Sequence, residues 1–346
     1  MADRRVGREQ VLAFRGRRHS LAEKRERADL VDVVGSCGIQ DTPPGNADVA
    51  LAARLDLDGP VVADAVSAKE LVLTWSLRGA PHLFPPGDLP VFTLGALPAE
   101  GTLEALWGQP EHALVEVERA MVEALPSPRT KAQVSGAVTK AVPAELAPYC
   151  RGCDVHHAHE SVFRAAPLLG RIVLTRTAPV TLARAATWLG ANATGDIGAL
   201  RTELLLRYLR CYAPTTPGHF AEWVGIAKSD ARARWAAVAD IVVPVDAGKR
   251  AFVLEEDLDA LLAAEPLRGV RLLPSKDVYL QARDRELLLP DKGDRTTVFT
   301  ILGGPGVVLV DGEPAGVWRG SVKGKRYELR WRPFGRVAKG ATVAMA

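Results

Sequence analysis

The sequence predicts an α+β protein in which two units of helix, turn, helix and strand are followed by a small antiparallel β-barrel. Helical periodicity, interrupted by turn residues, dominates as far as Leu267. Beyond Leu267, short Val-rich and aromatic runs alternate with Gly, Pro and Asp, as antiparallel strands do. Because helix, turn, helix and strand in this order are typical of a winged helix, we expect winged-helix regions at residues 1–145 and 146–265 and the barrel at 266–346.

The first region should contain four helices separated by turns. They are expected at residues 9–27, 30–38, 47–55 and 68–77. Two prolines at 43–44 exclude regular helix between the second and third. Asn46 is a favourable N-cap for the third helix, and Ser67 for the fourth. A short extended piece at His82–Phe84 then completes the first winged-helix pattern, and residues 85–145 are mostly helical.

The second region repeats the pattern after a strand at residues 172–174. Its helices are expected at residues 181–189, 199–211, 218–224 and 230–238. Thr215 or Thr216 should cap the third of these helices and Ser229 the fourth. A strand at residues 242–245 completes the second unit.

The third region should be built from strands. They are expected at residues 270–273, 298–302, 307–310, 316–319 and 327–331. Asp311-Gly312 is a strong hairpin signal between two of them. Apolar residues at 327, 329 and 331 alternate with charged residues at 328, 330 and 332, so one face of the last strand should be buried. These features fit a small barrel or half-barrel.

Composition places the chain among ordinary globular proteins. Its 346 residues are 47% hydrophobic and 25% charged, which excludes a disordered, collagen-like or fibrous chain. Four cysteines are too few for a disulfide scaffold, and the apolar runs are too short for a membrane helix. No apolar signal core follows the N-terminal arginines. We therefore expect a soluble, cytoplasmic monomer that does not associate with membranes.

The positive charge is concentrated near the two ends of the chain. The net charge is only +3, but the first 27 residues hold nine Lys or Arg against four acids. Residues 319–339 hold eight Lys or Arg against Glu328 alone. This distribution favours local contacts with a polyanion over a uniformly cationic surface. The alternative is that these arginines are simply solvated.

Four segments, in order along most of the chain, resemble the AlkZ/YcaQ-like winged-helix DNA glycosylases. They are Thr74–Leu83, Arg207–Gly225, Leu272–Arg285 and Val310–Arg319. In the first segment, Ala80 and Pro81 stand where the family has Thr and Leu. The resemblance implies tandem winged helices before a barrel, double-stranded DNA as the partner, a location on the nucleoid and no required cofactor. It also implies monofunctional hydrolysis of the N-glycosidic bond.

The family's activity depends on a Gln–apolar–Gln or Gln–apolar–Asp motif, and Gln40-Asp41-Thr42 occupies the matching place. Gln40 matches the first Gln, whereas Asp41 is not apolar and Thr42 is neither Gln nor Asp. A Gln can orient water, a carboxylate can stabilise the sugar cation, and a Thr hydroxyl does not ionise near neutral pH. The resemblance therefore implies these three residues as the catalytic set. The alternative is that Gln40 and Asp41 only cap the adjacent helices.

Several cationic residues are candidates for DNA contacts. Arg78 and His82 flank the expected first wing, where cations commonly meet phosphates or the minor groove. Further candidates in the basic end segments are Arg17, Arg18, Lys323 and Arg330. The alternatives are a packed histidine at position 82 and a surface ion pair at Arg78.

A Cys/His-rich segment at residues 150–159 holds two of the four Cys and three of the seven His. Thiolate and imidazole are the ligands that zinc prefers. A structural zinc would use Cys150, Cys153 and two nearby histidines, with His156 and His157 as the first candidates. The alternatives are a coincidental polar linker and, less favoured because no thioredoxin-like strand precedes it, a redox pair.

Two functions from different classes fit these observations. The first is a DNA glycosylase that excises alkylated bases, for which modest catalytic groups suffice because a cationic N-alkylated base is already a good leaving group. The second is a non-catalytic DNA-binding regulator or damage-binding protein with a degenerate site. A protein-interaction scaffold would instead present an apolar cleft. The direction of the Asp41 and Thr42 side chains relative to Gln40 should discriminate between the first two.

Overall fold

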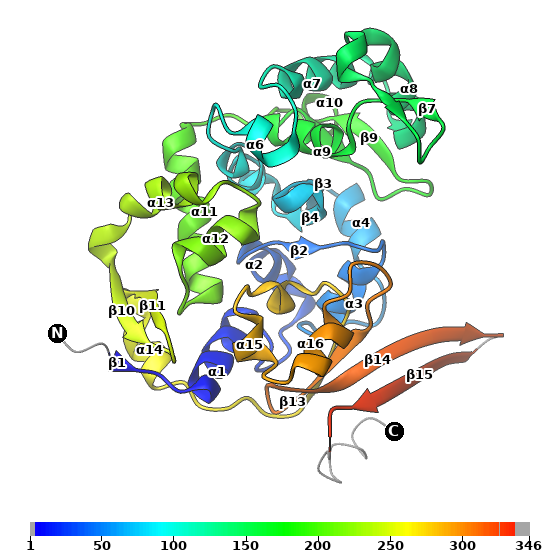
Figure 1. Ribbon diagram of the computed structural model, residues 1–346. Helices are drawn as coiled ribbons and strands as arrows, with labels where there is room; N and C mark the ends of the chain where they lie inside the picture. Colours follow the sequence, from blue (N-terminus) through cyan, green and yellow to red (C-terminus); the bar gives the residue numbers. More distant parts are fainter. Residues whose placement is uncertain (1–3, 325, 336–346) are drawn as a thin grey trace. The chain divides into compact units, whose positions relative to one another are not determined.

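The computed structural model describes residues 4–324 and 326–335 (Figure 1). The chain forms two compact units, each assembled from distant segments. Unit 1 comprises Met1–Pro60, Arg207–His219 and Val238–Ala346, and unit 2 comprises Val61–Leu206 and Phe220–Ala237. In the part of the chain that is described, no helix is both long and apolar enough to cross a bilayer. The division into three successive regions stays a prediction.

Unit 2 is built on an antiparallel sheet with strand order β4-β3-β8-β9-β5. The strands are β3 (Val72–Trp75), β4 (Pro81–Phe84), β5 (Arg129–Thr130), β8 (Ile172–Leu174) and β9 (Thr181–Arg184). The accompanying helices are α4 (Val62–Ser67), α5 (Leu89–Phe92), α6 (Leu103–Trp107), α7 (Ala113–Glu123), α8 (Lys131–Ala141), α9 (Glu160–Ala165), α10 (Ala185–Leu189) and α13 (Lys228–Ala236). A separate two-stranded ribbon pairs β6 (Tyr149–Cys150) with β7 (Val155–His156).

The structure corrects two of the helices that the sequence predicts in this unit. Ser67 ends α4 instead of beginning a helix, and the following apolar run forms the central strand β3. Residues 181–184 likewise form β9, and only the remainder of that segment is helical. All four residues of β3 are buried, so the strand shows no alternation of apolar and polar residues. A short run of this kind cannot be told from a buried helix by periodicity.

Unit 1 contains two sheets and the helices that carry the candidate site. Its helices are α1 (Arg8–Arg18), α2 (Leu30–Gly35), α3 (Asn46–Ala52), α14 (Leu258–Leu262), α15 (Arg285–Leu288) and α16 (Lys292–Val298). One sheet has the order β1-β10-β11, from β1 (Arg4–Arg5), β10 (Val242–Asp246) and β11 (Arg250–Leu254). Two boundaries between the units fall inside helices. One lies after Leu206 in α11 (Ile197–Tyr212), and the other lies after His219 in α12 (Pro217–Val224).

The C-terminal sheet is open, which corrects the expected barrel. It contains four strands in the order β12 (Val270–Leu273), β13 (Gly306–Val310), β14 (Glu313–Lys323) and β15 (Arg326–Pro333), and each neighbouring pair is antiparallel. Closure would require β15 to pair with β12, but these strands are the two edges. β14 pairs with β13 only as far as Trp318 and continues with β15 as a two-stranded hairpin (Figure 1).

The segment at residues 298–302 is not a strand. Helix α16 extends to Val298, and the residues after it form bends and irregular backbone. Ile301 and Leu302 are almost fully exposed, so their apolar side chains do not mark a buried strand. The Asp311-Gly312 turn is confirmed, since both residues have positive φ between β13 and β14.

Candidate functional site

The turn between β2 (Ile39–Gln40) and α3 carries the Gln40-Asp41-Thr42 motif in unit 1. Asp41 is 3% exposed, and its Oδ1 accepts hydrogen bonds from the backbone N–H groups of Gly45 (2.8 Å) and Ala47 (3.1 Å). The Asn46 side chain donates to the Thr42 carbonyl at 2.8 Å and to the Ser275 hydroxyl at 3.1 Å. Asp41 therefore caps the start of α3, as the structural alternative expected, and Asn46 ties the turn to the C-terminal part of the unit.

Gln40 and Thr42 each hold a buried side-chain oxygen without a hydrogen-bond partner. Gln40 is 7% exposed, and within the described residues no donor reaches its Oε1. The Thr42 Oγ1 is also buried and has no hydrogen-bond partner among the described residues. An unsatisfied buried polar group costs about 1–3 kcal/mol, so it needs an explanation such as a water or a ligand. Two such oxygens lie two residues apart in the motif.

A buried polar network fixes the segments that follow α3. Arg54 and Asp277 are both almost fully buried and form a two-point ion pair, with N–O distances of 2.9 and 2.8 Å. The Arg54 Nε also donates to the His19 carbonyl at 2.9 Å. The His19 ring packs edge-on against Tyr212 and Tyr279. Because a buried charge must keep its partner, this network holds the motif's supporting elements in one arrangement.

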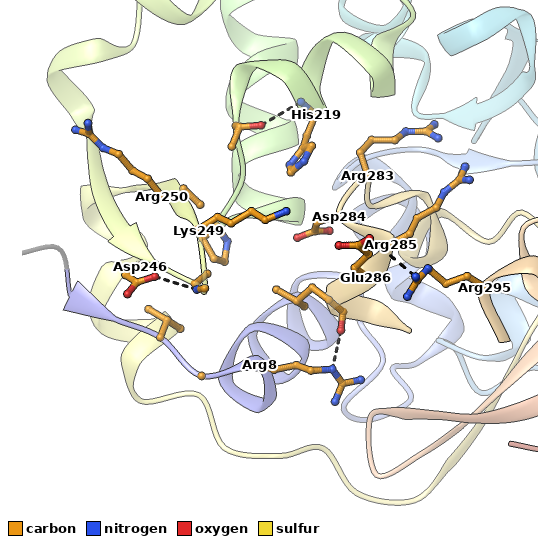
Figure 2. Close-up of a pocket in the computed structure, with 18 of the residues that line it drawn as sticks. Arg8, His219, Asp246, Lys249, Arg250, Arg283, Asp284, Arg285, Glu286 and Arg295 are labelled. Atoms are coloured by element: carbon orange, nitrogen blue, oxygen red, sulfur yellow. Dashed lines mark hydrogen bonds and ion pairs between the residues drawn. The ribbon is translucent and has the colours of Figure 1, made fainter. Parts of the chain in front are cut away.

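A large cavity within unit 1 has a volume of about 1520 Å³ (Figure 2). Its charged lining is mainly cationic, with seven Lys or Arg against three acids. The cations are Arg5, Arg8, Lys249, Arg250, Arg283, Arg285 and Arg295. The acids are Asp246, Asp284 and Glu286. A polyanion is the ligand that this charge balance favours.

The cavity wall includes a fixed carboxylate. Arg15 on α1 donates to both oxygens of Asp284, at 2.9 and 2.7 Å. Burial opposes the charge of Asp284, but Arg15 outweighs it and lowers the pKa of that carboxyl below its ordinary value. In Figure 2, Lys249 points toward Asp284 across the cavity, and His219 from α12 lies above them.

Sequence reasoning did not identify Lys249, Arg250 or His219 as functional residues. The cavity is assembled from four stretches far apart in the chain, at residues 5–8, 214–219, 246–251 and 283–301. No local motif marks such a site, because each stretch contributes only one or a few cations. The Arg283–Arg285 run was singled out only through the family resemblance.

The candidate arginines on α1 have partners inside unit 1. Arg17 donates to the Glu265 carbonyl, and Arg18 forms an ion pair with Asp257. Arg17 is nevertheless exposed, and Arg18 is partly exposed. Their guanidinium groups thus connect α1 to the segment around α14. DNA contacts by these two residues stay a prediction.

Arg78 and His82 have different environments in unit 2. Arg78 is exposed, has a φ of 56°, and donates to the Trp223 carbonyl. His82 is 1% exposed, and its Nδ1 lies 2.9 Å from the Ala80 carbonyl oxygen. Burial, with a smaller contribution from Arg78, lowers the pKa of His82 to about 3. His82 is therefore a packed, neutral histidine at pH 7, which does not fit a cationic contact with phosphate.

The two candidate residues near the C-terminus lie on the hairpin of β14 and β15. Arg330 is paired with Arg319 across the strands, and its side chain is 74% exposed. Its guanidinium lies 3.7 Å from the Glu328 carboxylate. Lys323 is the last residue of β14, and its side chain lies outside the described residues.

The Cys/His-rich segment brings three potential metal ligands together in unit 2. The Cys150 and Cys153 sulfurs and one ring nitrogen of His157 all lie within 4.8 Å of one another. His156 is not in this group, since its Nδ1 lies 3.1 Å from the Ala147 carbonyl oxygen. The backbone N–H of Cys153, followed by the His157 side chain, lowers the pKa of the Cys150 thiol to about 7.

A second group of potential ligands is fully buried in unit 1. It consists of His19, Cys37 and Cys211, with the Cys37 sulfur 3.7 Å from the His19 Nδ1. The His19 ring of this group is the one that packs edge-on against Tyr212 and Tyr279. Cys37 and Cys211 are both almost fully buried.

Comparisons with known proteins agree on one family. Residues 33–346 match the family model described as DNA glycosylase AlkZ-like. An interstrand DNA cross-link repair glycosylase of Streptomyces sahachiroi is 27% identical over 332 residues, covering 89% of this chain and 86% of the relative. The solved structure of Streptomyces sahachiroi DNA glycosylase AlkZ matches with a TM-score of 0.77 at 24% identity, over 98% of this chain and 94% of that one.

Proposed function

The chain belongs to the AlkZ-like DNA glycosylase family, and on that premise we propose that it excises alkylated bases from double-stranded DNA by hydrolysing the N-glycosidic bond. One observation carries the proposal. At the motif position, Gln40 and Thr42 hold buried side-chain oxygens that lack partners within the described chain. Oxygens in this state are suited to hold a water molecule or the sugar of a bound nucleotide.

The proposed reaction needs little acid catalysis. When the C1′–N bond breaks, its electron pair neutralises a cationic N-alkylated base, which leaves as a neutral molecule. A water oxygen then bonds to C1′ and releases a proton to solvent. Gln40 and Thr42 would orient this water. Asp41, whose carboxylate also caps α3, would add negative charge near the developing sugar cation.

The cationic cavity of unit 1 supports DNA as the substrate. Its seven Lys or Arg residues suit the phosphate backbone, which supplies much of the affinity of DNA-binding proteins. The family's tandem winged helices would present the duplex, and Arg78 is an exposed cation suited to a phosphate contact. The relative's printed name extends the candidate substrates to cross-linked bases.

Base release from alkylated duplex DNA tests the proposal. The wild type should liberate modified bases and leave abasic sites, measured by chromatography with mass spectrometry and by strand cleavage in alkali. Gln40→Ala should slow excision by about 10- to 100-fold, and Thr42→Val by about 10-fold, because both remove a group that orients water. Thr42→Val should not lower the melting temperature, since it keeps the shape of the side chain and the Thr42 hydroxyl has no hydrogen-bond partner in the described protein.

Gln109→Ala is the matched control, because the Gln109 side chain donates to the adjacent Gly108 carbonyl and lies outside the motif. It should excise at the wild-type rate. If Gln40→Ala and Thr42→Val also match the wild type, the motif does not act in the reaction. If the wild type releases no base from any alkylated duplex, the non-catalytic DNA-binding function replaces this proposal. Asp41's role as a helix cap already favours that alternative in part.

A further inference from the structure

The ribbon of β6 and β7 has little packing to hold its shape. Each strand has two residues, and Tyr149 and Val155 are about half exposed. The turn between them contains Gly152 and Asp154, and the φ of Asp154, 56°, lies in the left-handed region. An isolated ribbon of this length is marginal in water without a further constraint.

The turn nevertheless has a defined geometry. The N–H groups of Cys153 and Asp154 both donate to the Cys150 carbonyl, at 3.2 and 2.9 Å. These two hydrogen bonds to one carbonyl oxygen fold the Cys-x-x-Cys segment back on itself, and the two sulfurs lie close together. A Cβ on Gly152 would lie 3.9 Å from the Cys150 sulfur, so a larger side chain there would approach the sulfurs.

His157 completes the group from the far end of the ribbon. Its backbone N–H donates to the Pro148 carbonyl at 3.3 Å, which places the residue beside the start of β6. Its Nδ1 lies 2.7 Å from the Ala158 carbonyl oxygen and must donate to it. This hydrogen bond leaves the Nε2 lone pair available, which is the usual arrangement of a histidine that binds a metal.

We propose that Cys150, Cys153 and His157 bind one zinc ion, with water in the fourth position. Two thiolates and an imidazole form a ligand set that zinc prefers, and ligand atoms in a tetrahedral zinc site are about 3.5–4 Å apart. The three atoms already lie within 4.8 Å of one another, so closure needs only small movements. In the described chain, no fourth His, Cys, Asp or Glu joins the group.

The zinc would also fix the entry to α9. His157 lies three residues before this helix, whose Arg164 packs against Gly79. The Arg164 Nη1 lies 3.5 Å from the Gly79 carbonyl oxygen, next to Arg78. The metal therefore constrains the ribbon and, through α9, supports the turn that carries an exposed cation. This role is structural and does not depend on base excision.

Metal analysis of the full-length protein tests the site. Protein purified without chelator should contain about one zinc per chain, and cobalt added to the metal-free protein should produce thiolate-to-cobalt charge-transfer absorption. Cys153→Ser and His157→Gln should each weaken zinc affinity by at least about tenfold. Removing the metal should speed hydrogen exchange at residues 149–157 while leaving exchange in the core of unit 1 unchanged.

His156→Gln is the matched control, since it makes the same chemical change one residue away at a ring that faces the Ala147 carbonyl. It should retain the metal. Protein with neither zinc nor a cobalt signal would overturn the proposal, as would a Cys150–Cys153 disulfide as the stable form. Metal that persists in both Cys153→Ser and His157→Gln would also overturn it, and its loss in Cys211→Ser would assign the metal to the buried group of unit 1.

Discussion

His82 and Arg78 are four positions apart in the sequence, yet only Arg78 is charged at neutral pH. Arg78 is exposed, whereas His82 is almost fully buried and bonds to a backbone carbonyl through its ring. Removal from water penalises the charged imidazole, and the nearby Arg78 adds repulsion. The residue types alone allowed a cation at both positions and left a packed histidine at position 82 as the alternative. Burial, which the sequence does not display, separates them.

Acidification should destabilise the wild type more than His82→Gln. The pKa of His82 is about 3 in the folded protein against an ordinary value of 6.5, so the unfolded state binds this proton first. The stability from neutral His82 is complete above pH 6.5 and is lost as the pH falls toward 3. At pH 5 the loss is about 2 kcal/mol. Urea unfolding at pH 7 and pH 5 measures it, and identical pH dependence in both proteins would refute it.

At the scale of elements, the turn before α3 has a structural task and, under the proposed function, a chemical one. Asp41 accepts two backbone N–H groups, which satisfies donors at the start of a helix that has no other cap. The neighbouring Gln40 and Thr42 leave their oxygens unbonded within the described chain. A rigid cap between two available oxygens keeps them in a fixed geometry, as a site that positions water requires.

Two substitutions at Asp41 separate these tasks. Asp41→Ala should lower the free energy of unfolding by about 1–2 kcal/mol, because the cap is lost. Asp41→Asn keeps a carbonyl acceptor, so the protein should remain folded, but excision should fall about a hundredfold as the negative charge disappears. Denaturant unfolding and single-turnover base release measure the two effects. If Asp41→Asn retains full activity, Asp41 serves only as a helix cap.

Local signals in the sequence predicted many elements correctly. Asp311-Gly312 forms the expected turn because both residues tolerate positive φ, and the expected helix at 199–211 corresponds to α11. The errors arise where tertiary contacts decide. β3 is buried on both faces and lacks alternation, and Ile301 with Leu302 is apolar but exposed. Whether β15 meets β12 is equally non-local, so the open sheet was not foreseen.

For the whole molecule, net charge is a poor guide to DNA binding. A charge of +3 on 346 residues is nearly neutral, but the cavity of unit 1 is lined by seven Lys or Arg and three acids. Its lining comes from distant parts of the chain, so its existence could not be predicted from the basic segments alone. The sequence did identify the motif turn, because its three residues are adjacent.

DNA binding should weaken steeply as salt rises, because each neutralised phosphate releases counterion. Arg5→Gln and Lys249→Gln, both in the cavity lining, should each reduce the slope of log K against log salt by about one unit. Fluorescence anisotropy with a labelled duplex between low and moderate salt measures the slope. Lys140→Gln on α8, an exposed lysine outside this lining, should leave it unchanged. Salt-independent binding would contradict the cavity as the DNA site.

The discontinuous make-up of unit 1 has a consequence for folding during synthesis. Arg8 on α1 bonds to Leu287, Leu288 and Glu313, partners about 280 to 305 positions later in the chain. The ribosome therefore releases α1 long before its partners exist, while Val61–Leu206 and Phe220–Ala237 emerge earlier and can form unit 2 first. The apolar side chains of Val11 and Phe14 stay uncovered until residues 245–261 have been made, and Arg8 waits longer still, until translation reaches β14. Chaperone dependence should therefore concentrate on this segment in nascent chains, and refolding should be slow because its contacts close very long loops.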